Sequence, residues 1–85
     1  LQGKIEEIGD LVHITRDNLP DLFKKILVVT TSDSQRLYPE IRNNNLNQLD
    51  NIKVNDIVDI EYTFEGSEKN GKRYNNIYIN QITKV

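Results

Sequence analysis

The sequence contains no cysteine, and this absence excludes several kinds of site at once. Without thiols the chain can form no disulfide scaffold, no thiolate zinc site and no cysteine nucleophile, and the composition suits a reducing compartment such as the cytoplasm. Histidine is scarce too: His13 has no second imidazole with which to share a metal ion. We therefore expect His13 to be a solvated loop residue, and the protein to bind neither a metal nor another cofactor.

Patterns typical of membrane proteins, secreted proteins and enzymes are missing as well. No apolar run approaches the roughly 18 residues of a membrane span, and the sequence shows neither a signal peptide nor an Asn-x-Ser/Thr glycosylation site. The four glycines form no phosphate-binding loop, and the serines have no histidine base in a triad arrangement. We expect a cytoplasmic protein that is not an enzyme.

An excess of positive charge is also lacking. The 85 residues include 13 acidic and 11 basic residues, which gives a formal net charge of −2. Global attraction to a polyanion is therefore not expected, and any binding of nucleic acid requires a local basic patch. A chain of this length has room for one modest core. Because no linker or repeat divides it, we treat residues 1–85 as a single domain.

The strongest positive signal is a long β-hairpin over residues Asn55–Val85. Its first strand alternates apolar with polar side chains, which is the period of a strand buried on one face. Asn70 and Gly71 can adopt the positive φ angles of a type I′ turn, and a second β-rich run follows them. The apolar side chains of the first strand, all of which we assign to the core, are Val58, Ile60, Tyr62 and Phe64.

Two further strands are predicted near the start of the chain. Residues Leu1–Ile8 form a strand that bends or bulges near its end, and Gly3 allows a neighbouring strand to approach closely. Gly9–Leu22 contains turn residues and is predicted to be a connecting loop. Phe23–Thr31 is the most β-prone segment, and its apolar run Ile26–Val29 predicts a strand that is buried on both faces over part of its length.

A third strand and a short helix follow. Gln35–Arg42 has strand periodicity, but Pro39 has no N–H group for a ladder, so this strand should lie at a sheet edge or carry a bulge. In Asn43–Asn51, Leu46 and Leu49 are spaced by three residues, and asparagine is a favoured N-cap residue. This pattern predicts a helix of about two turns with one apolar edge on the sheet.

The predicted order of elements is three strands, a short helix and two strands. This order is that of the OB-fold, a five-stranded, partly open barrel whose helix fills the gap between the third and fourth strands. The predicted fold class is therefore mainly β, with the order β-β-β-α-β-β. An SH3-like barrel is the main alternative, but it does not normally place an apolar-edged helix at this position.

Five segments resemble a family of short bacterial OB-fold proteins that is similar to single-stranded-DNA-binding and primosomal replication proteins. In order they are GKIEEI, KKILVVTT, YPEI, IKVNDIVDIEYTFEG and NGKRYNNI, and the resemblance runs from Gly3 to Ile82. Asn55 stands where the family usually has glycine, which is tolerable because asparagine also enters left-handed conformations. The family often has an aromatic residue near Arg73, and here that residue is Tyr74. The resemblance implies the OB-fold and, by analogy of fold, binding of single strands.

A surface for single-stranded nucleic acid needs cations that follow the backbone and flat side chains on which bases stack. In an OB barrel the second and third strands, together with the loops that flank them, form the usual binding face. Basic and tyrosine side chains of this sequence fall on those segments. The candidate nucleic-acid-binding residues are Lys25, Arg36, Tyr38, Arg42, Lys72, Arg73 and Tyr74. Tyr78 should face away from Ile77 and Ile79, toward solvent, a ligand or a partner.

Two functions of different kinds remain open. The first is non-enzymatic binding of single-stranded DNA, as an accessory to replication or recombination. The alternative is a protein-interaction or oligomerisation module that pairs through an exposed strand edge. A homodimer is compatible with both functions. Asp59, Glu61 and Glu65 form an acidic strand face that we expect to be solvated and to repel DNA on that side.

Overall fold

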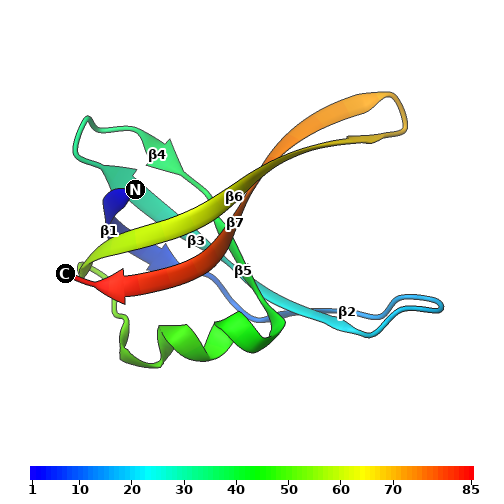
Figure 1. Cartoon of the computed structure of the whole chain (residues 1–85), viewed down its shortest axis with the longest axis horizontal. Coiled ribbons are helices and arrows are strands. Elements are labelled where there is room, and N and C mark those ends of the chain that lie inside the picture. The colour runs from blue at the N-terminus through cyan, green and yellow to red at the C-terminus, as the bar shows by residue number, and fades with distance from the viewer.

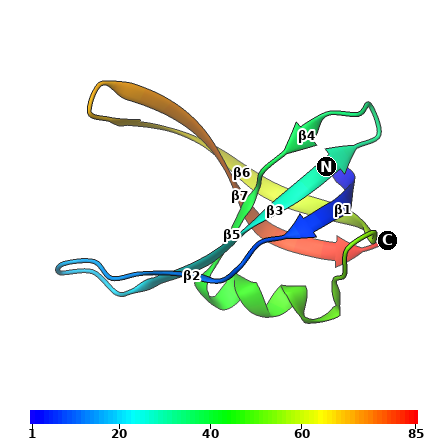
Figure 2. The same cartoon turned by 180° about the vertical axis from the view of Figure 1, so that it is seen from behind.

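The computed structural model describes residues 1–85, and its strands form one sheet that curls into a barrel (Figure 1, and from behind in Figure 2). The hydrogen-bonded order is β1-β6-β7-β5-β3-β2, β4 pairs with β3, and a pairing of β1 with β3 joins the sheet to itself. The elements are β1 (Gln2–Ile8), β2 (Val12–Ile14), β3 (Leu22–Thr31), β4 (Arg36–Leu37), β5 (Glu40–Arg42), the 3₁₀ helix η1 (Asn43–Asn51), β6 (Ile57–Lys69) and β7 (Lys72–Lys84).

This architecture confirms the predicted OB-fold. The five predicted strands correspond to β1, β3, β4 with β5, β6 and β7, and the helix lies between the third and fourth of them. The third strand is interrupted at Tyr38 and Pro39, as expected for a proline that cannot donate to a ladder. Beyond this interruption, β5 pairs with β7 in parallel through Glu40 and Tyr78, which closes the barrel.

Several local predictions are also confirmed. A Cβ atom on Gly3 would lie 2.5 Å from Cγ1 of Val29, so only glycine lets β1 approach β3 this closely. The register of β1 against β3 shifts between Ile5 and Glu7, which is the expected bulge. Asn70 and Gly71 have φ angles of 53° and 78°, as a type I′ turn requires. Asn55 has a φ of 79°, so it takes the left-handed conformation available to the glycine it replaces.

The barrel encloses one apolar core. Side chains from the inward face of each long strand meet there, and the helix adds Leu49 with Leu46 packed beside it. The buried residues of this cluster are Ile5, Leu27, Val29, Ile41, Leu49, Ile52, Val58, Ile60, Ile79 and Ile82. None of the helical structure has the length and apolar character needed to cross a membrane.

Two arms project from the barrel in the same direction along its longest axis (Figure 1). One is the far half of the β6–β7 hairpin, and the other is formed by β2 and the start of β3. The prediction that Tyr62 and Phe64 belong to the core is therefore wrong. These side chains are 43% and 61% exposed because β6 continues past the end of the barrel, although they share the inward parity of Ile60.

Three smaller predictions are corrected. The loop predicted for residues 9–22 contains β2, and His13 lies in that strand, opposite Phe23 of β3. The run Ile26–Val29 is not buried on both faces, since Ile26 is 42% exposed while Leu27 and Val29 are buried. The helix has no side-chain cap, and the carboxamide oxygen of Asn43 accepts a hydrogen bond from the Phe23 backbone N–H (3.1 Å) instead.

Candidate nucleic-acid interface

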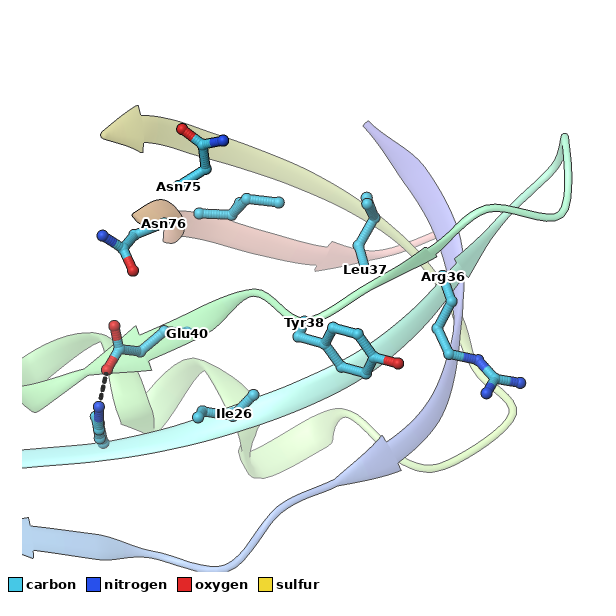
Figure 3. A pocket seen from close by; sticks show the side chains of 9 residues that line it. Ile26, Arg36, Leu37, Tyr38, Glu40, Asn75 and Asn76 are labelled. Atoms are coloured by element: carbon cyan, nitrogen blue, oxygen red, sulfur yellow. Dashed lines mark ion pairs between the residues drawn. The ribbon is translucent and has the colours of Figure 1, made fainter. Parts of the chain in front are cut away.

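A pocket of about 300 Å³ lies where the β6–β7 hairpin separates from the strand that carries β4 and β5 (Figure 3). Its walls come from β3, from the β4–β5 connection and from the middle of β7. This volume is at the lower end of the range for small-ligand pockets. The lining residues are Lys24, Ile26, Arg36, Leu37, Tyr38, Glu40, Asn75, Asn76 and Ile77.

Tyr38 is the most exposed apolar surface of this pocket. The residue is 60% exposed, and its ring lies between Ile26 and Arg36 in the view of Figure 3. The local sequence explains this position, because Leu37 and Pro39 on either side turn inward and Pro39 is buried. The pocket thus combines an exposed aromatic side chain, the cation of Arg36 and the exposed side chain of Ile26.

Glu40 supplies a buried carboxylate to the same pocket. The residue is only 8% exposed. Lys24 Nζ lies 2.6 Å from its Oε1 atom, and Arg42 Nη2 lies 3.0 Å from its Oε2 atom. The charged side chains that line the pocket are Lys24, Arg36 and Glu40, which gives a local charge of +1. The pocket is therefore locally basic on a chain whose net charge is −2.

Arg42 is held inside this network rather than in the pocket. Its guanidinium carbon lies 4.4 Å from the centroid of the Tyr78 ring, within the range of a cation–π contact. The ring of Tyr78 is thus covered by Arg42 of the same protein, and this contact is what the ring faces on that side. With Glu40 on one side and Tyr78 on the other, Arg42 orients the carboxylate, and phosphate contact by Arg42 stays a prediction.

Of the predicted residues, Arg36 and Tyr38 line the main pocket and the others do not. Arg73 and Tyr74 line an adjoining hollow on the hairpin that shares Asn75 with the main pocket. Lys72 is exposed next to the hairpin turn. Lys25 pairs with the buried Ile41 across β3 and β5, so it lies on the opposite face of the strand from the pocket.

The predicted site leaves out four polar residues that line this pocket. A period-2 signal was available for Glu40, because it shares the parity of Arg36 and Tyr38. Lys24 requires knowledge of the register, in which it pairs with Arg42 while Ile26 pairs with Glu40. Asn75 and Asn76 enter because β7 passes the β4–β5 connection, a long-range arrangement with no local sequence signal.

The acidic residues occupy a different part of the surface. Asp59 and Glu61 line a separate hollow with residues near the end of β7, and this hollow shares no residue with the basic pocket. No group of three or more potential metal ligands occurs in the structure. The acidic strand face is exposed, as predicted. Asp59 and Glu61 lie apart from the basic pocket, whereas Glu65 pairs with Asn76 at its edge.

The sequence matches no family model and no curated protein. The structure is similar to the N-terminal domain of PriB protein from Thermoanaerobacter tencongensis, whose structure is described as dimeric. The similarity covers 100% of this chain and 91% of that domain, with a TM-score of 0.57 and 23% sequence identity. This likeness shows the fold, and it agrees with the resemblance to primosomal OB-fold proteins indicated by the sequence.

Proposed function

We propose that this protein binds single-stranded DNA without catalysing a reaction, as an accessory to replication or recombination. The observation that carries the proposal is that the exposed side chain of Tyr38 and the side chain of Arg36 line the same pocket. A base stacks on the ring while the cation contacts the adjacent phosphate. Stacking on one aromatic side chain is worth about 1–3 kcal/mol and tolerates any base.

A track of cations extends from this pocket in two directions. Toward the hairpin, the chain offers the exposed side chains of Lys72 and Arg73, with Tyr74 as a second aromatic surface. Toward β1, Thr30 pairs with Arg36 on one side and with Lys4 on the other. Lys4 and Arg36 are therefore two strands apart on one face of the sheet, roughly 10 Å. A single strand that crosses Tyr38 can contact both groups of cations.

The salt dependence of binding tests this function. Fluorescence anisotropy of a labelled single strand of mixed sequence, titrated with protein at about 50 and about 200 mM salt, should show saturable binding that weakens steeply as salt increases. Absence of binding at the lower salt, at protein concentrations above the roughly 10⁻⁴–10⁻⁶ M typical of non-specific binders, would end the DNA proposal.

A second candidate function, self-association, rests on a separate observation. An apolar hollow of about 190 Å³ lies between the start of the chain, the β4–β5 connection and the hairpin. Tyr62 and Phe64 expose their rings there and contact each other edge to face, with centroids 6.3 Å apart. The other lining residues are Leu1, Gln35, Leu37, Pro39, Ile60 and Ile77.

We propose that a second copy of this chain covers this hollow. Contiguous apolar surface of this kind is typical of interaction sites, and the similar PriB domain is described as dimeric. β6 pairs with β1 through Ile57, Val58 and Asp59, and Ile60 exchanges hydrogen bonds with Leu1, so the edge of β6 beyond Ile60 is free to meet another strand. Self-association is compatible with DNA binding because the apolar hollow and the basic pocket share only Leu37 and Ile77.

A further inference from the structure

The carboxylate of Glu40 retains hydrogen-bonding capacity that the protein does not use. A carboxylate has about four lone-pair sites, and here one oxygen faces Lys24 while the other faces Arg42. Oε1 has almost no accessible surface and is occupied by the ion pair with Lys24, so the oxygen that a ligand can reach is Oε2. Oε2 has lone pairs beyond the one directed at Arg42, and an N–H group of a ligand in the pocket can donate to it.

The geometry of the pocket indicates what kind of donor fits. Tyr38 and Glu40 are two residues apart on the same face, which separates their Cα atoms by roughly 6.5–7 Å. Both line the pocket, and Ile26 and Ile77 supply its apolar surface. A flat ring that stacks on Tyr38 therefore presents its edge to Glu40. Figure 3 shows the carboxylate and the tyrosine ring in a row along the β4–β5 connection.

Asn76 adds a second acceptor to this edge. Its amide nitrogen donates to Ser67 Oγ (3.0 Å) and to the Glu65 carbonyl oxygen (3.4 Å), which fixes the orientation of the carboxamide. The oxygen of the carboxamide is left to accept from a ligand. Glu40 and Asn76 are thus two acceptors in the same pocket. Of its cations, Lys24 is paired with Glu40, and Arg36 contacts phosphate in the proposed complex.

Bases differ in what they present to such acceptors. Cytosine carries an exocyclic N4 amino group and adenine an N6 amino group, whereas thymine presents the O4 carbonyl oxygen at the corresponding position. Carboxylates accept hydrogen bonds from cytosine N4, and they repel a carbonyl oxygen. We propose that Glu40 makes this pocket prefer cytosine, or another base with an exocyclic amino group, over thymine in the bound strand. This inference rests on the proposed binding of single-stranded DNA and adds base selection to it.

Competing base compositions provide the test. We would measure anisotropy with labelled oligo-dC and oligo-dT of about 12 nucleotides, within the site size of one OB-fold, at low salt and at a slightly alkaline pH that keeps cytosine neutral. The full chain should bind oligo-dC about tenfold more tightly, the lower part of the range for a good side chain–base pair. Glu40→Gln, which exchanges an acceptor for a donor, should bring the ratio close to one. Glu61→Gln makes the same change at an exposed site on β6 and should keep the preference.

A chemical change in the DNA removes any dependence on how well the Glu40 variant folds. An oligonucleotide of the 2-pyrimidinone nucleoside lacks only the amino group of cytosine, and the unaltered protein should bind it about as weakly as oligo-dT. Equal affinity for oligo-dC and this analogue, or equal affinity for oligo-dC and oligo-dT, would overturn base selection and leave DNA binding intact. Failure to bind any of the three at low salt would overturn both proposals.

Discussion

The two hollows on either side of Leu37 and Ile77 share these side chains but have opposite chemistry. One contains Lys24, Arg36 and Glu40, and the other is almost entirely apolar. Alternation along a single stretch of chain produces this difference. From residue 36 to residue 40, the polar side chains and Tyr38 project to the basic pocket, while Leu37 and Pro39 project to the apolar hollow.

Under the two proposals, this division lets a small barrel meet two partners without a second domain. The gap opens because β5 pairs with β7 through Glu40 and Tyr78, while β4 pairs with β3 instead of β7. The hairpin then departs from the barrel and leaves a surface on each side. We assign the basic side to DNA and the apolar side to a second copy, and changes confined to one side should leave the other function unaltered.

The largest expected effect comes from removing the stacking ring and the adjacent cation together. Tyr38→Ala with Arg36→Glu should weaken binding of a mixed-sequence single strand by about 100-fold, because stacking contributes about 1–3 kcal/mol and a phosphate contact is reversed in sign. Anisotropy titration measures this change. Tyr62→Ala with Lys53→Glu is the matched control, because it makes the same two kinds of change outside the basic pocket. Its affinity for DNA should stay within about twofold of that of the unaltered chain. Equal losses of affinity in both double variants would contradict the division between the hollows.

Glu40 should matter to stability as well as to binding. Glu40→Ala leaves Lys24 and Arg42 without their shared carboxylate, and we expect the free energy of unfolding to fall by about 2 kcal/mol. This is below the 3–5 kcal/mol of a fully buried pair, because the side chains of Lys24 and Arg42 are 22% and 37% exposed. Urea unfolding followed by circular dichroism measures the change. The exposed Glu61→Ala variant should change stability by less than about 0.5 kcal/mol, and the same loss in both would remove the special role of the buried cluster.

On the apolar side, Phe64→Ser should weaken self-association by about tenfold, since burial of an aromatic side chain contributes about 1.5–3 kcal/mol. Sedimentation equilibrium over a range of concentrations measures the dissociation constant of the dimer. Tyr74→Ser changes an aromatic residue of similar exposure on the other strand of the hairpin, and it should leave the dimer intact. A chain that stays monomeric at the highest concentration, or an unchanged constant for Phe64→Ser, would show that no second copy covers this hollow.

Sequence periodicity predicted the fold well because most strands have a neighbour on each side. Val58 and Ile60 are buried as their parity requires. Tyr62 and Phe64 continue that parity, yet nothing covers them within the chain. Alternation tells which way a side chain points, but the point at which β6 leaves the barrel depends on where its neighbour β1 stops pairing with it. This is a long-range property.

The residues of the candidate site also fall into those that local parity predicts and those that depend on long-range strand pairing. Arg36 and Tyr38 were predicted from their parity within one strand, and both line the pocket. The choice between Lys24 and Lys25 depends on how β3 pairs with β5, which places Lys25 opposite the buried Ile41. Adjacent lysines on a strand are equivalent in composition and opposite in direction, so only the register can separate them.

The smallest expected effect tests how far the DNA side extends along the hairpin. Lys72→Glu with Arg73→Glu should reduce the slope of log affinity against log salt by about 1.4, since each phosphate contact of a single strand contributes about 0.7. Affinity at low salt should fall several-fold, which is less than for the Tyr38 variant, because both side chains are exposed. Arg73 loses only a loose contact with Glu68 (3.7 Å). Lys53→Glu, an exposed charge change outside both hollows, should leave the slope unaltered. An unaltered slope in the double variant would confine the strand to the pocket around Tyr38, and the hairpin would then serve the second copy alone.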